Sequence, residues 1–300
     1  MSLDVAGVGA SAVDLVYVLP AYPAPEGPLS KLPIQSHFVS PGGQMATAMA
    51  GCAALGLRAA FLGATGNDEH GARIRESLAR RGVDVSHATT LDAPQPYSVI
   101  LLAQDQGERI VLWHRDARAK FHPDDYSRFA GPISEARLLH VDDVDLEAGI
   151  AAATIAREAG RLVTTDIDRV TDRTSELIQL ATHPILAEHV PAKLTGEKDL
   201  LRALRRLRAL NAGPLIVTRG AQGALALDGD AVIDAPGFAI EAVDTTGAGD
   251  IFRAGFITAL LEGQPLKDAL RFANAAAASS CTRQGAMASV PSRADVDRML

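Results

Sequence analysis

Cysteine and aromatic residues are scarce in this chain of 300 residues, which has two cysteines, one tryptophan and 4% aromatic residues. Cys52 and Cys281 are too few for a disulfide framework and lack metal-ligand spacing, so a reducing compartment, the cytoplasm, is expected. No apolar run approaches the roughly 20 residues that a membrane helix needs, and no basic region precedes the first apolar stretch. Neither a membrane anchor nor a signal peptide is therefore expected.

Positive charge is also in deficit, because 29 Lys and Arg residues face 36 Asp and Glu residues, for a net charge of −7. This balance argues against general nucleic-acid binding and leaves room for a local basic pocket. An apolar content of 47% with 22% charged residues fits a globular protein with an aliphatic core and excludes a disordered chain.

Strand and helix patterns alternate along the chain. Strands are expected over 3–9, 58–62, 138–141, 162–166 and 214–218, and helices over 44–55, 70–81, 146–158, 200–210, 251–261 and 266–282. This alternation predicts an α/β fold with a mainly parallel sheet covered on both faces. The Pro-rich segment 20–33 and a hairpin over 97–113 break the rhythm, and they are expected to form a small β accessory.

The segment Gly7–Ala12 matches G-x-G-x-x-A after a strand, which by itself would indicate an NAD-linked oxidoreductase. That motif must open a helix, whereas the residues after Ala12 are β-branched and run into Pro20. We therefore interpret the glycines of this segment as residues that let the chain turn tightly at the end of a strand. Asp14, a carboxylate just beyond the strand edge, is a candidate acceptor for a sugar hydroxyl.

The segment Asp244–Asp250, with the sequence DTTGAGD, is the strongest motif and leads into an amphipathic helix. Free backbone N–H groups at a helix start can hold an anion, and glycine at 247 and 249 allows close backbone approach. Asp250 would lie in the first helical turn beside that anion. A carboxylate there is placed to take a proton from a hydroxyl that attacks phosphorus.

This segment resembles the D-T-x-G-A-G-D signature of the ribokinase-like, PfkB-type carbohydrate kinases. Four further blocks in family order resemble that family: Gly42-Gly43 with its small-residue helix, Gly63–Gly71, Val217–Gly223, and Cys281–Ala286. The resemblance implies a three-layer α/β/α sandwich with a small β-sheet lid. It implies one kinase domain over 1–300, with lid segments at approximately 14–40 and 95–115.

The resemblance implies transfer of the γ-phosphoryl group of ATP to a sugar hydroxyl, with Asp250 as general base and the backbone of Gly247, Ala248 and Gly249 as the anion hole. The substrate-binding candidates are Asp14, Gly42, Gly43, Gln44, Thr47, Asp166 and Arg253. The nucleotide-binding candidates are Thr218, Gly220, Gly223, Thr245 and Asn274.

The implied cofactors are ATP and Mg²⁺, together with K⁺ at a monovalent-cation loop. The positions matching that loop are Asp244, Thr246, Arg283, Gly285 and Ser289. The family's Asn-x-x-Glu motif for magnesium is altered here, because Ala187 and Val190 stand at its two key positions. Glu188 is the carboxylate left in that segment, and Mg²⁺ would otherwise rely on water and the nucleotide.

These departures argue against assigning ribose as the substrate. The Leu194–Gly196 block without Asn, together with Cys281–Gly285, is similar to the sulfofructose-kinase branch, which would need cations for an anionic sugar. The candidate cations are Lys31, Arg115, Arg118, Lys120, Arg169 and Arg253. A catalytically impaired nucleotide- or sugar-binding regulator and a nucleoside kinase stay open as alternatives. The expected partners are a sugar and ATP, with no nucleic acid and no membrane, and the resemblance suggests a homodimer through the lid.

Overall fold

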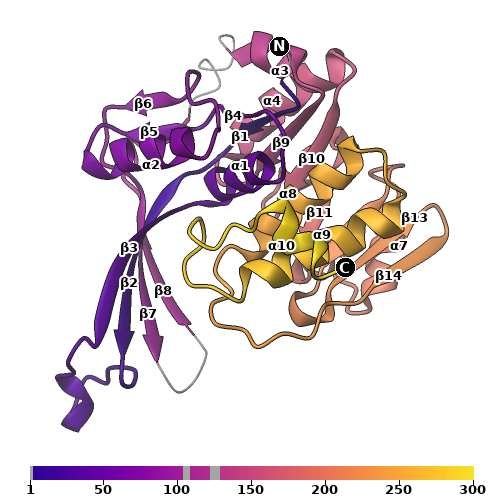
Figure 1. Cartoon of the computed structure of the whole chain (residues 1–300). Helices are drawn as coiled ribbons and strands as arrows, with labels where there is room; N and C mark the ends of the chain where they lie inside the picture. Colours follow the sequence, from indigo (N-terminus) through magenta and orange to yellow (C-terminus); the bar gives the residue numbers. More distant parts are fainter. Residues whose placement is uncertain (1–2, 104–108, 122–128) are drawn as a thin grey trace.

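The computed structural model describes residues 3–103, 109–121 and 129–300, and its main body is a twisted sheet between two layers of helices (Figure 1). The strands of this sheet are β1 (Val5–Val8), β4 (Ala59–Phe61), β9 (Leu138–Asp142), β10 (Leu162–Asp166), β11 (Ile185–Ala187), β12 (Leu215–Thr218), β13 (Ala224–Asp228) and β14 (Ala231–Ala235). The order is β4-β1-β9-β10 and then β11-β12-β13-β14, and the parallel bridges Thr164–His183 and Ile167–Leu186 join the two halves. The strands run parallel up to β12, and β13 and β14 are antiparallel.

Alternate strand residues point into two separate apolar cores. Val5 and Leu138 pack with one helix layer, and their neighbours Ala6 and Leu139 pack with the other. The first layer comprises α1 (Gln44–Ala54), α2 (Glu69–Arg80), α8 (Ala248–Leu261), α9 (Leu266–Ser280) and α10 (Arg293–Asp297). The second comprises α3 (Ala130–Glu135), α4 (Leu146–Glu158), α5 (Thr174–Leu180), α6 (His189–Thr195) and α7 (Leu200–Leu207). The predicted α/β/α sandwich with a mainly parallel sheet is confirmed.

A second sheet projects from one edge of the body (Figure 1). Its strands are β2 (Ala12–Leu19), β3 (Ser36–Gly42), β7 (Tyr97–Ala103) and β8 (Arg109–His114), in the order β3-β2-β7-β8. We call this sheet the lid. The predicted 97–113 hairpin is present as the antiparallel pair β7–β8, while its turn at 104–107 lies outside the described residues. The Pro-rich segment supplies a 3₁₀ turn at Gly27–Ser30 between β2 and β3.

A two-stranded sheet, β5 (Ala64–Gly66) with β6 (Thr89–Leu91), lies beside α2 and completes the fold. The Gly7–Ala12 segment is followed by strand β2, so no helix opens there and the dinucleotide-binding interpretation is wrong. Its glycines serve packing, because a Cβ on Gly7 would lie 2.6 Å from the Met45 sulfur and one on Gly9 would lie 2.2 Å from Asp142 Oδ2. Among the described residues, no helix combines the length and apolarity needed to cross a membrane.

Candidate active site

The turn that opens α8 is built by Gly247, whose φ of 80° is readily adopted only by glycine. Ala248 N–H donates to the Thr245 carbonyl at 3.3 Å, so this predicted anion-hole donor is already engaged. The N–H groups of Gly249 and Asp250 have no acceptor among the described residues. Because the first N–H groups of a helix lack internal partners, this turn presents donors for an anion at Gly249 and Asp250.

Asp250 is half-buried in the first turn of α8, beside a cluster of carboxylates from several elements. Burial raises its pKa well above the ordinary value, and the charges of Asp166, Asp142 and Asp14 raise it further. The guanidinium of Arg253, one helical turn later, acts in the opposite direction. A carboxylate with a raised pKa is a stronger base than an exposed aspartate, provided that it is ionised.

Arg253 is 4% exposed, and its Nη2 lies 2.5 Å from Asp166 Oδ1, whose side chain is also 4% exposed. Burial raises the pKa of Asp166 to about 6, while Arg253 and a hydrogen bond from Gln44 counteract this rise. Arg253 and Asp166 are both absent from the walls of the two cavities described below. Arg253 and Asp166 are thus held together in a buried ion pair, and their predicted contacts with sugar stay predictions.

One cavity of about 540 Å³ gathers all five residues predicted to bind the nucleotide. Its lining includes Thr218, Gly220, Gly223, Thr245 and Asn274, and it reaches Ala248 and Gly249 at the start of α8. Asn274 is buried, and its Nδ2 donates to the carbonyls of Ala235 at 2.8 Å and Pro236 at 3.2 Å. A mostly apolar wall that ends at helix N–H donors suits a flat base at one end and phosphates at the other.

A second cavity, of about 260 Å³, lies between the main sheet and the lid. Gly43 and Gln44 line it, as predicted for the sugar side, and Tyr97, Trp113 and Arg115 line it from the lid and the segment after β8. The candidate cations for binding an anionic sugar differ in their position relative to this cavity. Arg115 and Arg169 line this cavity, whereas Arg118 is exposed and pairs with Asp116.

Asp14 is buried on β2 directly against Gly42, because a Cβ on that glycine would lie 2.5 Å from Asp14 Oδ2. Thr47 is fully buried in α1, where it packs under the Gly247 turn and its hydroxyl has no hydrogen-bond partner among the described residues. Its position therefore fits support of that turn and does not fit the predicted contact with sugar.

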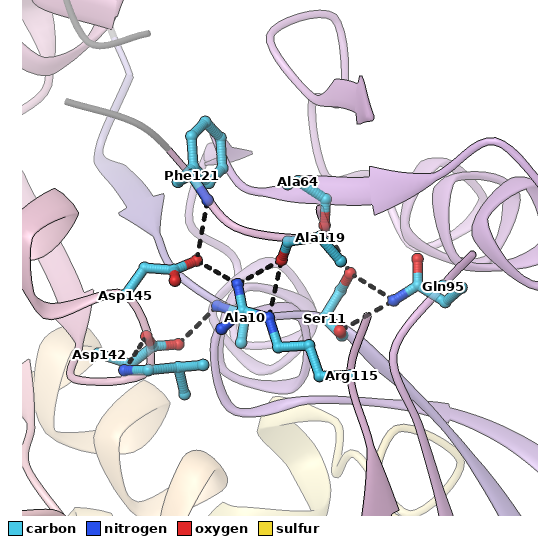
Figure 2. A network of polar contacts seen from close by, with 10 residues as sticks. Ala10, Ser11, Ala64, Gln95, Arg115, Ala119, Phe121, Asp142 and Asp145 are labelled. Atoms are coloured by element: carbon cyan, nitrogen blue, oxygen red, sulfur yellow. Dashed lines mark hydrogen bonds and ion pairs between the residues drawn. The ribbon is translucent and has the colours of Figure 1, made fainter. Parts of the chain in front are cut away.

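Figure 2 shows a polar network around the second cavity that the sequence patterns did not reveal. Asp142 Oδ2 accepts from Ala10 N–H at 2.7 Å, and burial raises the pKa of Asp142 to about 7. The amide of Gln95 donates to the carbonyl and hydroxyl oxygens of Ser11 at 2.9 and 3.1 Å. Asp142 could have been found from its place after a buried strand, the signal that drew attention to Asp14. Gln95 carries no comparable signal.

Asp145 joins the same network from the start of α4. Its Oδ2 accepts from Arg115 at 2.6 Å and from Phe121 N–H at 3.3 Å, while its buried Oδ1 has no partner among the described residues (Figure 2). Asp143 Oδ1 is likewise buried without a partner in the described part of the chain. Buried carboxylate oxygens without donors suit ligand hydroxyls, because an unpaired buried acceptor is costly.

The predicted cation loop is held together by Asp244. Its Oδ1 accepts from Thr246 N–H at 2.8 Å and its Oδ2 from Gly285 N–H at 2.9 Å. Ser289 is buried and donates to the Ala286 carbonyl at 3.1 Å, whereas the exposed Arg283 side chain pairs with Asp295. These predicted positions lie together, apart from the side chain of Arg283.

Glu188 is exposed at the end of β11, next to the Thr218 end of β12. Within residues 3–103, 109–121 and 129–300, no group of three His, Cys, Asp or Glu side chains has the geometry of a metal site. The described side chains therefore do not form a protein cage for Mg²⁺.

The sequence model of pfkB family carbohydrate kinases matches residues 6–293. The chain belongs to the pfkB family of carbohydrate kinases. It is therefore an ATP-dependent phosphotransferase, as the sequence motifs predicted. The family assignment agrees with the position of the Asp244–Asp250 motif, of which Thr245, Ala248 and Gly249 line the 540 Å³ cavity.

Known relatives act on different sugars. The chain is 27% identical to a ribokinase of Haemophilus influenzae, over 95% of this chain and 94% of that protein. It is 32% identical to a fructokinase of Klebsiella pneumoniae, over 87% of this chain and 92% of the relative. The structure of Arabidopsis thaliana ribokinase complexed with ribose and ATP superposes with a TM-score of 0.85 at 25% identity, covering 100% of this chain and 99% of the other.

Proposed function

We propose that this pfkB-family kinase transfers the γ-phosphoryl group of ATP to a hydroxyl of a sugar or sugar derivative, with Asp250 as the general base. The observation that carries the proposal is the position of the α8 turn. Gly249 forms part of the wall of the 540 Å³ cavity, and Asp250 follows directly beside Asp166, which Gln44 of the second cavity contacts. A donor in one cavity and an acceptor in the other would meet at Asp250.

The proton of the attacking hydroxyl would pass to the carboxylate of Asp250. Its raised pKa favours proton uptake, and the nearby Arg253 keeps a share of the carboxyl ionised. The N–H groups of Gly249 and Asp250 would hydrogen-bond the transferred phosphoryl group as negative charge develops on its oxygens. Loss of one such donor typically slows an enzyme about 100- to 1,000-fold.

The nucleotide would lie along the 540 Å³ cavity, with its base near Asn274 and its phosphates toward Thr218, Gly220 and the α8 turn. Bound Mg²⁺ would neutralise phosphate charge, with Glu188, at the edge of the sheet, as its candidate side-chain contact. Asp244 and the Gly285 loop would hold K⁺ mainly through backbone carbonyls. These assignments are part of the proposal.

The sugar would lie in the 260 Å³ cavity, with Gly43 and Gln44 in its wall and the lid strands over it. The predicted contact Asp14 is buried next to this wall, against Gly42. Asp143 and Asp145 add buried carboxylate oxygens without partners among the described residues, which suit hydroxyl donors. The acceptor class is therefore a polyhydroxylated sugar or sugar derivative. A homodimer through the lid, where Leu112 and Trp113 are exposed on β8, is part of the same proposal.

Replacement Asp250→Asn tests the proposal, because asparagine keeps the size of the side chain and removes the base. We expect phosphoryl transfer to fall at least about 1,000-fold while the affinity for ATP stays within a few fold. ADP release should be followed over ribose, fructose, phosphorylated and sulfonated ketoses and nucleosides, with and without K⁺.

The outcomes separate the alternatives. Unchanged turnover in the Asp250→Asn variant would exclude Asp250 as the base. Turnover of nucleosides alone would identify a nucleoside kinase. A wild-type chain that binds ATP and sugar without releasing ADP would instead be a binding regulator, which the altered Ala187 and Val190 positions would explain.

A further inference from the structure

Arg253 is a buried cation next to the Gly249–Asp250 turn, and it lines neither of the two cavities. It lies one helical turn after Asp250 on α8, with Nη2 at 2.5 Å from Asp166 Oδ1 at the end of β10. Its Nε is buried without a hydrogen-bond partner among the described residues. A buried guanidinium with an unused donor is costly, so a function for this charge is worth seeking.

The guanidinium packs directly against the turn that holds the base. A Cβ built on Gly249 would lie 2.8 Å from Arg253 Nη1, so only glycine at this position lets the charge approach the backbone so closely. The charged groups that face Asp250 come from three strands and from its own helix. They are Asp14 on β2, Asp142 on β9, Asp166 on β10 and Arg253 on α8, and Arg253 is the cation among them.

We propose that Arg253 is a positioning residue for phosphoryl transfer, held by Asp166 so that its guanidinium supports the Gly249–Asp250 turn from inside the protein. This inference rests on the proposed role of Asp250. The fixed positive charge offsets the surrounding carboxylates, which keeps Asp250 ionised for proton uptake. It also lies behind the amide donors of the turn, where it favours the negative charge that develops on the phosphoryl oxygens.

Two single replacements that both remove the ion pair should shift the titration of Asp250 in opposite directions. Arg253→Met removes a positive charge, so Asp250 should titrate at higher pH and the acid limb of kcat should move upward. Asp166→Asn removes a negative charge, so the pKa of Asp250 and the acid limb of kcat should both move to lower pH. A pair that only holds the fold together would leave kcat at the optimum pH close to the wild-type value, whatever the titration of Asp250 does. Shifts of equal sign, or no shifts, would show that the pair does not act on the charge of Asp250.

The titration of Asp250 should be measured on the full chain without ligands, by NMR of ¹³Cγ-labelled aspartate. The Asp250 signal is identified by its loss in Asp250→Asn. This readout needs no sugar. The kcat profile should use whichever of D-ribose, D-fructose or fructose 6-phosphate is turned over fastest. For Arg253→Met we expect kcat to fall about 100-fold with the KM for ATP little changed, as for a misplaced catalytic group.

Two further variants serve as controls. Arg253→Lys keeps the charge, so it should restore the wild-type acid limb while recovering only part of kcat. Arg58→Met breaks the Arg58–Asp4 pair at the other end of β1, and it should lower stability and leave the titration of Asp250 unchanged. If Arg253→Met fails to fold, Arg253→Lys carries the test, because it keeps the charge and loses the planar fork of donors, and a wild-type kcat in this variant would overturn the positioning role.

The two proposals fail in different ways. Turnover that survives in Asp250→Asn would exclude Asp250 as the base. There would then be no reason to assign a positioning role to Arg253. Transfer that is lost in Asp250→Asn, combined with shifts of equal sign in Arg253→Met and Asp166→Asn, would leave the base in place and overturn the role of Arg253.

Discussion

At the scale of single residues, glycines around the site make room for carboxylates. A Cβ on Gly42 would lie 2.5 Å from Asp14 Oδ2, and one on Gly9 would lie 2.2 Å from Asp142 Oδ2. Each glycine belongs to a sequence motif, and in each case the structure gives a steric reason for it. The motif at Gly7–Ala12, which resembled a nucleotide fingerprint, is therefore explained by packing.

Replacement Gly42→Ala should push the Asp14 carboxylate out of place without touching the nucleotide cavity. We expect the KM for the sugar to rise roughly 10- to 100-fold, because small displacements of positioning groups are costly, while the KM for ATP stays unchanged. Steady-state kinetics with both substrates varied would measure this split. In the control Gly131→Ala, the new Cβ meets nothing within 4 Å, so both constants should stay at wild-type values.

At the scale of elements, the alternation of strands and helices was predictable because long periodic segments bury large apolar faces. Helices α1, α4 and α9 and the β7–β8 hairpin occur where the sequence predicted them. The short elements β5, β6, β11, α3 and α6 were missed, since three to seven residues show too little periodicity to reveal an element.

The candidate site likewise contains residues that the sequence pointed to and contacts that it did not. Gly43, from a motif, and Asn274, named from the family resemblance, both line cavities, and their roles in binding stay predictions. The buried pair of Arg253 and Asp166 depends on a helix crossing the edge of the sheet, and the contact of Gln95 with Ser11 joins segments 84 residues apart. Contacts of this kind follow from the tertiary arrangement, and no local pattern encodes them.

The lid carries an optical probe of sugar binding, because its Trp113 is the one tryptophan in the sequence. Trp113 is 72% exposed on β8 and also lines the 260 Å³ cavity. If sugar binds there, the indole should lose water contact, and its emission should shift to shorter wavelength when sugar is added. ATP alone should leave the emission unchanged, and Trp113→Phe should lack the signal. An unchanged spectrum with a saturating sugar that is turned over would place the sugar elsewhere.

At the scale of the whole molecule, folding buries titratable groups of two kinds. The pKa of Asp142 is raised to about 7 and that of Asp166 to about 6, while burial lowers the pKa of His140 to about 3 and that of His183 to about 4. Between about pH 4 and pH 7, the folded protein holds carboxyl protons that the unfolded chain has released. Below the ordinary histidine pKa of 6.5, the unfolded chain binds imidazole protons that the folded protein excludes.

The free enzyme should therefore be most stable in mildly acidic solution. The slope of the unfolding free energy with pH follows the protons bound by the unfolded state minus those bound by the folded state. Below about pH 4 this difference is positive, because the pKa of Asp4 is lowered to about 2 by its pairing with Arg58. Between about pH 4 and 6 the two buried histidines and the two buried carboxyls oppose each other in this difference. Above about pH 6.5 the histidines of the unfolded chain have released their protons, so Asp142 makes the difference negative until its own carboxyl ionises. Each fully linked proton contributes of the order of 1 kcal/mol per pH unit. Urea unfolding at intervals from pH 5 to pH 8 would locate the maximum.

Asp142→Asn separates the carboxyl contribution from the rest. An uncharged amide releases no proton in this range, so the variant should lose less stability between pH 6 and 8 than the wild type does. Asp116→Asn is the matched control, because Arg118 lowers the pKa of Asp116 to about 2 and this carboxyl is ionised in both states throughout the range. A decline in Asp142→Asn as steep as that of the wild type would show that the buried proton belongs to another group, with Asp250 as the next to test.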